Sequence, residues 1–266
     1  KRELIKIAQS IFLNSKKLDY DKTSSELIEE TEAQLFALSE NKKFESNKLI
    51  AFSQSIELAM TSASLAHENK GKLSGISTGF LAVDDLLGGL HKSDLIILAG
   101  RPSMGKTALA TNIAYNAASN NNEEKSVAFF SLEMSAEQLA NRILAEQATL
   151  SSDQIRRGKL TKEDFTKLSN VSKEISSNKL FIDDTPAINV STLRTRARRL
   201  KRKLNNELGL IVVDYLQLMR GNKKHENRVQ EISEITQGLK SVSKELNVPV
   251  LALSQLSRAV EQREDK

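Results

Sequence analysis

The sequence predicts an α/β fold in which a mostly parallel sheet is covered by helices on both faces and is preceded by an all-helical N-terminal segment. Three observations support this prediction. The first 66 residues contain neither Gly nor Pro, which suits uninterrupted helices. From Gly71 onward, apolar runs of strand length alternate with helical patterns, an order typical of parallel sheets. These runs are nearly continuous, as in strands that are buried on both faces.

The N-terminal part contains helical patterns that two polar breaks separate. Apolar residues recur at helical spacing over Leu4–Phe12 and over Leu27–Leu38, and the polar breaks are Asp21–Ser25 and Ser39–Asn47. A third helix carries one apolar stripe, made of Leu49, Phe52, Ile56, Met60 and Ala63. The stripe either packs on its own domain or docks on a neighbouring subunit, and the pattern leaves both open.

Five strands and five helices are expected in the remaining chain. The strands follow the apolar runs Leu95–Ala99, Ser126–Ser131, Lys179–Ile182, Leu210–Asp214 and Val248–Ser254. The helices follow the periodic segments Lys106–Ala118, Ala136–Ala148, Lys162–Ile175, Ser191–Leu204 and Arg228–Leu246. Because ligands of such sheets bind at the carboxyl ends of the strands, residues that follow strands are the candidates for a site.

A phosphate-binding motif follows the first expected strand. Residues 100–107 read Gly-x-x-x-x-Gly-Lys-Thr and lie between that strand and a helix, the context in which this motif binds phosphates. Backbone N–H groups hold the phosphates, Lys106 reaches the β- and γ-phosphates, and Thr107 offers a hydroxyl to Mg²⁺. The nucleotide-binding residues are expected to be Gly100, Arg101, Pro102, Ser103, Met104, Gly105, Lys106, Thr107 and Ala108. The alternative is a plain glycine turn before a helix.

A second magnesium ligand is expected at the end of another buried strand. Asp214 follows the four apolar residues 210–213, and an Asp in this position normally anchors Mg²⁺. The alternative is a strand-end Asp that faces water. The sequence therefore predicts ATP and Mg²⁺ as cofactors, with Thr107 and Asp214 as the protein ligands of the metal.

The residue after Asp214 is Tyr215 rather than a carboxylate, so a catalytic base must come from elsewhere. Glu133 follows the strand Ser126–Ser131 and is expected at the carboxyl edge of the sheet. There it could orient and deprotonate the attacking water, or it could stabilise the positive end of the next helix. Gln255 ends the last expected strand and could either sense the γ-phosphate or cap the strand.

The composition limits the class of protein. The chain has 266 residues, a net charge of +5 and no cysteine, which excludes disulfides and thiolate metal sites and suits the cytoplasm. No apolar run approaches the roughly 18 residues that a membrane span needs, so no membrane partner is expected. The chain begins without an initiator Met or a signal peptide, and we interpret it as a fragment of a longer protein. The positive charge weakly favours a polyanionic partner.

Several motifs together resemble the RecA-like P-loop ATPases and, among them, the bacterial replicative DNA helicases of the DnaB type. Gly75–Phe80 and Leu86–Leu90 resemble the lead-in of RecA-like ATPases. The closer resemblance rests on Ser131-Leu132-Glu133-Met134, Ile182-Asp183-Asp184-Thr185-Pro186, Asp214-Tyr215-Leu216-Gln217-Leu218 and Leu253-Ser254-Gln255-Leu256-Ser257-Arg258. It covers about residues 71–266.

This resemblance implies a homohexameric ring that moves along single-stranded DNA and unwinds forked duplexes, with a primase and a helicase loader as further partners. It implies that Glu133 is the catalytic base and Gln255 the γ-phosphate sensor, beside Lys106. It divides the chain into the helical end of an N-terminal domain (1–45), a linker helix and hinge (46–70) and a RecA-like ATPase domain (71–266). It also makes the apolar stripe of the linker helix a contact with the neighbouring subunit.

One departure from the family concerns the C-terminal end. In the family, the chain continues past the Gln255 region with the last strands and with basic residues that reach into the neighbour's nucleotide site. The present sequence ends at Lys266, so neither Arg258 nor Arg263 is assigned as an arginine finger. We expect that group beyond residue 266 or in the neighbouring subunit, and without it turnover falls by about 10³–10⁵-fold.

Two basic segments are candidates for contact with nucleic acid. Ser191–Asn206 carries seven basic residues and no acid, so it is either a solvated surface helix or a contact with DNA or an acidic neighbour. Arg220–Arg228 follows the Asp214 strand, and both its place and the resemblance suggest a DNA-facing loop, with Lys223, Lys224 and Arg228 on phosphates. A mobile polar loop is the alternative. The segment contains no Phe, Tyr or Trp, so base stacking is not suggested.

Two other functions stay open. A RecA-like recombinase would form open filaments rather than closed rings. A non-catalytic module would use its helical N-terminal section for assembly with a loader or primase.

Overall fold

The computed structural model describes residues 2–16, 31, 34, 51–68, 73–119, 125–221 and 227–256. The chain divides into two units, residues 1–72 and 73–266. In the first unit, α1 (Arg2–Lys16) and α3 (Phe52–Glu68) correspond to two expected helices. The helix expected over Leu27–Leu38 lies outside the described residues, apart from Thr31 and Gln34, which are helical.

The second unit alternates strands and helices along the chain. Its elements are α4 (Leu81–Leu87), β1 (Leu95–Gly100), α5 (Lys106–Ser119), β2 (Ser126–Ser131), α6 (Ala136–Gln147), α7 (Ser152–Arg156), α8 (Lys162–Ile175), β3 (Leu180–Asp183), α9 (Val190–Lys203), β4 (Leu208–Asp214), η1 (Leu216–Leu218), α10 (Arg228–Leu246) and β5 (Val250–Gln255). Every expected strand and helix of this unit is present, with ends within two residues of the prediction. The short elements α4, α7 and η1 were not predicted, because they span too few residues to show a period.

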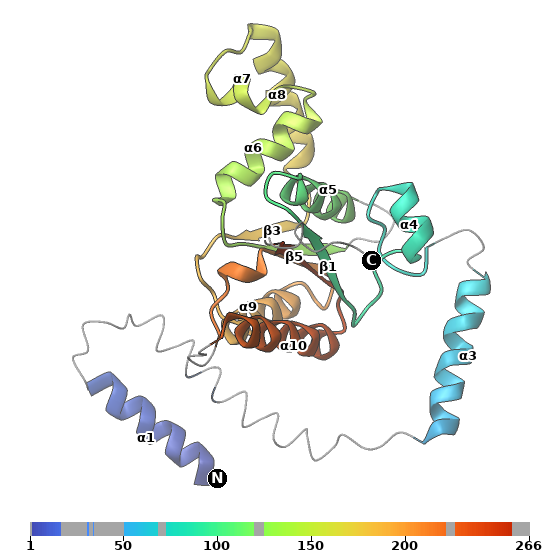
Figure 1. Cartoon of the computed structure of the whole chain (residues 1–266), viewed down its shortest axis with the longest axis vertical. Helices are drawn as coiled ribbons and strands as arrows, with labels where there is room; N and C mark the ends of the chain where they lie inside the picture. Colours follow the sequence, from blue (N-terminus) through green and yellow to red (C-terminus); the bar gives the residue numbers. More distant parts are fainter. Residues whose placement is uncertain are drawn as a thin grey trace, which may run out of the picture. The chain divides into compact units, whose positions relative to one another are not determined.

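The five strands form one parallel sheet in the order β1-β5-β4-β2-β3. Figure 1 shows α5 on one face of the sheet and α9 and α10 on the other. This arrangement confirms the predicted α/β class with helices on both faces, and it is the RecA-like arrangement. Among the described residues, no helix is long and apolar enough to cross a membrane.

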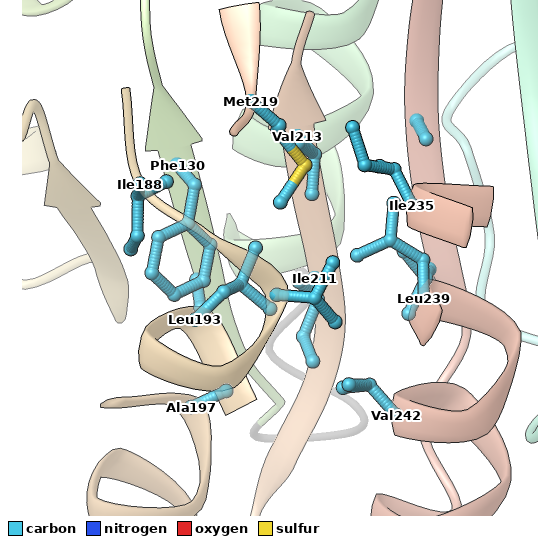
Figure 2. Close-up of a cluster of buried hydrophobic side chains, with 14 of the residues drawn as sticks. Phe130, Ile188, Leu193, Ala197, Ile211, Val213, Met219, Ile235, Leu239 and Val242 are labelled. Carbon is cyan, nitrogen blue, oxygen red and sulfur yellow. The ribbon is translucent and has the colours of Figure 1, made fainter. Parts of the chain in front are cut away.

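Alternate side chains of the central strand β4 pack into two hydrophobic cores, one on each face of the sheet. Leu210 and Val212 face α5, whereas Ile211 and Val213 face α9 and α10. Figure 2 shows the second core, in which side chains of α9 and α10 close over Ile211 and Val213. All four β4 side chains are fully buried, and each such burial stabilises the fold by about 1.5–3 kcal/mol. Packing on both faces therefore fixes the strand whose end carries Asp214.

The strand β1 is less covered than its apolar sequence predicts. It lies at one edge of the sheet and pairs with β5, and Ile97 is 42% exposed. The difference arises because an apolar run shows that a strand can be buried but does not show its place in the sheet.

The lead-in segment before β1 is held by a buried carboxylate. Asp84 is 4% exposed and accepts hydrogen bonds from Ser77 Oγ at 2.6 Å, from Thr78 N at 2.8 Å and from Thr78 Oγ1 at 2.7 Å. Asn116 Nδ2 of α5 donates to the carbonyl oxygen of Thr78 at 3.1 Å. The segment is thus fixed to α5, the helix that begins with Lys106 and Thr107.

Candidate active site

The phosphate motif forms a curled loop between β1 and α5. Ser103 and Gly105 have φ angles of 64° and 84°, the left-handed conformation that curls the backbone. A Cβ at Gly105 would meet nothing within 4 Å, so glycine is needed there for its conformation rather than for space. Lys106 Nζ donates to the carbonyl oxygen of Arg101 at 2.7 Å. Its ammonium therefore lies over the loop, where phosphates would be bound.

The two expected metal ligands meet beneath this loop. Asp214 is the last residue of β4 and is 1% exposed, and the Thr107 hydroxyl donates a hydrogen bond to its carboxylate. Burial raises the pKa of Asp214, and the negative charge of Glu133 adds to the rise. The Thr107 hydrogen bond and the charges of Arg142 and Lys106 oppose it. The charges of Arg142 and Lys106 thus do not fully offset the effect of burial on this carboxylate.

The residues present fit a magnesium ion. Asp214 Oδ2 is buried and has no hydrogen-bond partner, which is rare for a buried carboxylate oxygen. Among the described residues, no group of three or more His, Asp or Glu side chains gathers as a metal site. Mg²⁺ in nucleotide sites takes few protein ligands and completes its shell with waters and phosphates, so a Thr–Asp pair beside a phosphate loop matches this ion.

Glu133 lies at the same edge, in the turn between β2 and α6. Leu132 N donates to the carbonyl oxygen of Asp214 at 2.7 Å, which fixes this turn to the end of β4. The carboxylate is exposed, and its charge raises the pKa of Tyr215 after the larger effect of burial.

The N-terminus of α6 uses other groups. Ser135 and Gln138 form a capping box, and Asp184 Oδ2 accepts from Ala136 N at 2.9 Å. These side chains satisfy N–H groups at the start of α6, so Glu133 is not needed there as a cap, and both interpretations of Glu133 stay open.

Gln255 is the last residue of β5 and pairs with Gly100, the first residue of the phosphate motif. It is half-buried, and Leu256 N donates to the carbonyl oxygen of Gly100 at 3.1 Å. Sequence reasoning therefore selected a residue that the fold places next to the loop.

Two residues near the site were missed by sequence reasoning. Gln217 in η1 hydrogen-bonds to the backbone of Gln255, and Arg142 on α6 acts electrostatically on Asp214. Gln217 stood within a motif already noted, whereas a single Arg in an amphipathic helix carries no signal of its own.

The candidate DNA loop is described only at its ends. Lys223 and Lys224 lie outside the described residues. Arg228 begins α10, and its guanidinium contacts the carboxylate of Glu231 and the carbonyl oxygen of Gln217. To contact a DNA phosphate, Arg228 would have to exchange these partners.

In the other basic segment, α9, several basic side chains contact groups of β3 and α10. Arg196 pairs with Asp183 at 2.8 Å, Arg194 and Arg198 pair with Glu245 of α10, and Lys201 donates to the carbonyl oxygen of Leu246. The helix is thus bound to β3 and α10 and is not simply a solvated face. A cleft of about 270 Å³ between β3 and α9 lies at this edge, lined partly by Phe181, Arg196 and Lys203.

Comparison with known proteins gives a consistent result. The replicative DNA helicase DnaB of Rickettsia conorii is 51% identical over 274 residues, covering 100% of this chain and 55% of the relative. DnaB of Geobacillus stearothermophilus is 51% identical over 203 residues, covering 76% of this chain and 44% of that protein. The chain therefore spans about half the length of the curated relatives it matches.

Solved structures agree. The structure of a DnaB-like replicative helicase, described together with its interactions with primase, matches with a TM-score of 0.76 and 31% identity, covering 99% of this chain and 59% of that chain. A second solved structure, described as an ATPase domain, matches with a TM-score of 0.72 and 34% identity, covering 79% and 73% of the two chains. A family model described as the DnaB-like helicase C-terminal domain matches residues 75–266, and this chain belongs to that family.

Proposed function

We propose that this chain is the motor part of a replicative DNA helicase that hydrolyses ATP with Mg²⁺ in a homohexameric ring, moves along single-stranded DNA and unwinds forked duplexes. The observation that carries the proposal is the Thr107–Asp214 pair beside the phosphate loop, with one buried Asp214 oxygen left without a partner. The family match directs this nucleotide site to helicase chemistry rather than to recombination.

The residues of the loop bind and orient the triphosphate. Backbone N–H groups of residues 100–108 hold the phosphates, and Lys106 leaves the Arg101 carbonyl to reach the β- and γ-phosphates. Thr107 and Asp214 hold the metal. Held by these two residues, a bound Mg²⁺ would supply positive charge against the negative charge that develops on the phosphates.

Glu133 and Gln255 complete the chemistry proposed for one subunit. Glu133 orients the attacking water and accepts its proton, for which its exposed position at the sheet edge gives access. Gln255 senses the γ-phosphate. The pairing of Gln255 with Gly100, where β5 lies beside β1, supports this role. The neighbouring subunit supplies the arginine finger.

The proposed ring places DNA-binding groups near this edge. Lys223, Lys224 and Arg228 contact backbone phosphates without reading sequence. The linker helix α3 leaves Phe52, Ile56 and Met60 exposed, at 80%, 47% and 61% of their surfaces. Apolar side chains exposed in one stripe need a covering partner, and we propose that a neighbouring subunit covers them. A primase and a helicase loader are further proposed partners, in the cytoplasm.

A fork-unwinding assay on the full-length protein tests this function. Wild type is expected to unwind a forked duplex with ATP and to be inactive without it, while Lys106→Ala loses both ATPase activity and unwinding. Circular dichroism should show an unchanged fold, because the Lys106 ammonium donates to the Arg101 carbonyl within the loop and supports no part of the core. Full ATPase activity in Lys106→Ala would overturn the site.

Two further measurements separate the alternatives. Electron microscopy distinguishes closed rings from the open filaments of a recombinase. If the full-length protein with single-stranded DNA hydrolyses no ATP, the chain is an assembly module instead.

A further inference from the structure

The turn that carries Glu133 is closed by the side chain of Ser131. Ser131 is the last residue of β2 and is 1% exposed. Its Oγ donates a hydrogen bond to the carbonyl oxygen of Met134 at 2.6 Å and accepts one from Met134 N at 3.2 Å. One hydroxyl thus uses both its donor and its acceptor on a single residue, and Glu133 lies in the turn that these two bonds close.

The start of this turn is fixed to the strand that carries the proposed metal ligand. Leu132 N donates to the carbonyl oxygen of Asp214 at 2.7 Å. The Leu132 side chain is 8% exposed and belongs to the core under α9 and α10. The backbone immediately before Glu133 therefore cannot shift without disturbing both a hydrogen bond to β4 and a buried side chain.

The other end of the turn is fixed to β3 by Asp184. Asp184 Oδ2 accepts a hydrogen bond at 2.9 Å from Ala136 N, at the first residue of α6. The helix has a capping box of its own, made by Ser135 and Gln138, so its start does not depend on Asp184 alone for a cap. Because Asp184 directly follows β3, whereas the box is local to α6, the Asp184 bond sets where the helix begins relative to the sheet.

We propose that Ser131 and Asp184 are positioning residues, which fix the backbone on either side of Glu133 and so place its carboxylate for catalysis. The inference rests on the proposed function, in which Glu133 is the catalytic base. A base must come within about 2.6–3.2 Å of the proton that it accepts. The Glu133 side chain is exposed, so its reach is set by the backbone that carries it. A misplacement of about 1 Å can lower the rate by about 10²-fold.

The test is a set of double-mutant cycles on the full-length protein, in which ATPase kcat and KM are measured with single-stranded DNA present. Ser131→Ala removes the hydroxyl that closes the turn. Ser126→Ala is its matched control, because Ser126 lies on the same strand, is fully buried, and has no hydrogen-bond partner for its Oγ among the described residues. Asp184→Ala removes the second anchor, whereas Asp184→Asn keeps an oxygen that can accept from Ala136 N.

Ser131→Ala and Asp184→Ala are each expected to lower kcat by about 10–100-fold. The KM for ATP should change by less than about threefold, because the proposed phosphate-binding residues 100–108 are untouched. Ser126→Ala and Asp184→Asn should keep kcat within about threefold of wild type. When Glu133→Gln is already present, adding Ser131→Ala or Asp184→Ala should lower kcat by less than about twofold, because both residues act only through Glu133.

A purely structural role predicts a different result. The losses in Ser131→Ala and Asp184→Ala would then multiply the loss in Glu133→Gln, and this outcome overturns the inference. Lost turnover in Glu133→Gln beside wild-type kcat in both anchor variants overturns the inference alone. Wild-type turnover in Glu133→Gln overturns the proposed role of Glu133 and the inference with it. If Ser131→Ala does not fold, the cycle on Asp184→Ala decides.

Discussion

Removing the carboxylate of Asp84 should destabilise the ATPase unit while leaving its surface unchanged. In Asp84→Ala, Thr78 N loses its acceptor, although Thr78 is fully buried. The Thr78 hydroxyl keeps a weak alternative in the Phe80 carbonyl at 3.5 Å, and Ser77 Oγ is part-buried and can turn to water. The main losses are therefore the acceptor of the buried Thr78 N–H group and the charge-assisted hydrogen bond from the Thr78 hydroxyl.

The size of the effect follows from these contacts. A hydrogen bond to a charged group contributes about 1.5–3 kcal/mol, and a buried donor without a partner costs about 1–3 kcal/mol. Because the three bonds share one carboxylate, their contributions do not simply add, and we expect a total of about 3 kcal/mol. For a domain of this size each kcal/mol lowers Tm by about 2–4 °C, so the expected fall is about 6–12 °C.

Thermal unfolding by circular dichroism at pH 7 measures this fall, with Asp85→Ala as control. Asp85 lies on the same short helix but is exposed, so its loss should shift Tm by less than about 2 °C. A Tm for Asp84→Ala equal to that of the control would refute the reasoning.

The pH dependence gives a second check. Burial alone would raise the pKa of Asp84, but hydrogen bonds from Ser77, Thr78 and Gly79 outweigh it and hold the pKa below the usual 3.8. A lowered pKa means that the carboxylate stabilises the fold above pH 3.8 and loses this contribution as pH falls through the lower, folded-state value. The difference between wild type and Asp84→Ala should therefore shrink below pH 3.8.

Three further predictions concern the base, the core and an ion pair. Glu133→Gln should bind ATP normally but lose about 10²–10⁴-fold in phosphate release, and wild-type turnover would return Glu133 to a helix-stabilising role. Ile211→Ala should lower the free energy of unfolding by about 2–5 kcal/mol in urea, well beyond Ile97→Ala on the exposed edge strand. Asp183→Ala should cost about 1–2 kcal/mol at pH 7, because it removes the carboxylate that pairs with Arg196. Burial alone would raise the pKa of Asp183, but its bonds to Arg196 and Thr185 lower it. The cost of Asp183→Ala should therefore vanish in acid. A cost that does not change with pH would show that the destabilisation has another cause.

The sequence predicted best those elements whose burial shows as a local run of apolar residues. β2 and β4 are buried at every position, and their apolar runs gave their limits to within two residues. The exposure of β1 could not be read in the same way. Strand order depends on how the crossovers between strands pack, and a run of apolar residues says nothing about its neighbours.

The contacts of α9 show a second limit. Its seven basic residues read as an outer face, because no acid lies within the segment. The partners Asp183 and Glu245 come from β3 and α10, so the pairing exists only once the elements have packed. Gln217 escaped notice for a similar reason, since its partner is the backbone of residue 255, and a backbone group has no sequence signature.

The order of the strands explains why residues so distant in sequence share one site. β4 lies between β5 and β2, so Asp214 at its end has Gln255 on one neighbouring strand and the Glu133 turn after the other. The β5 end in turn pairs with Gly100 at the start of the phosphate loop. Parallel strands that end at one edge necessarily gather their following residues there. A nucleotide bound at this edge thus touches the ends of adjacent strands.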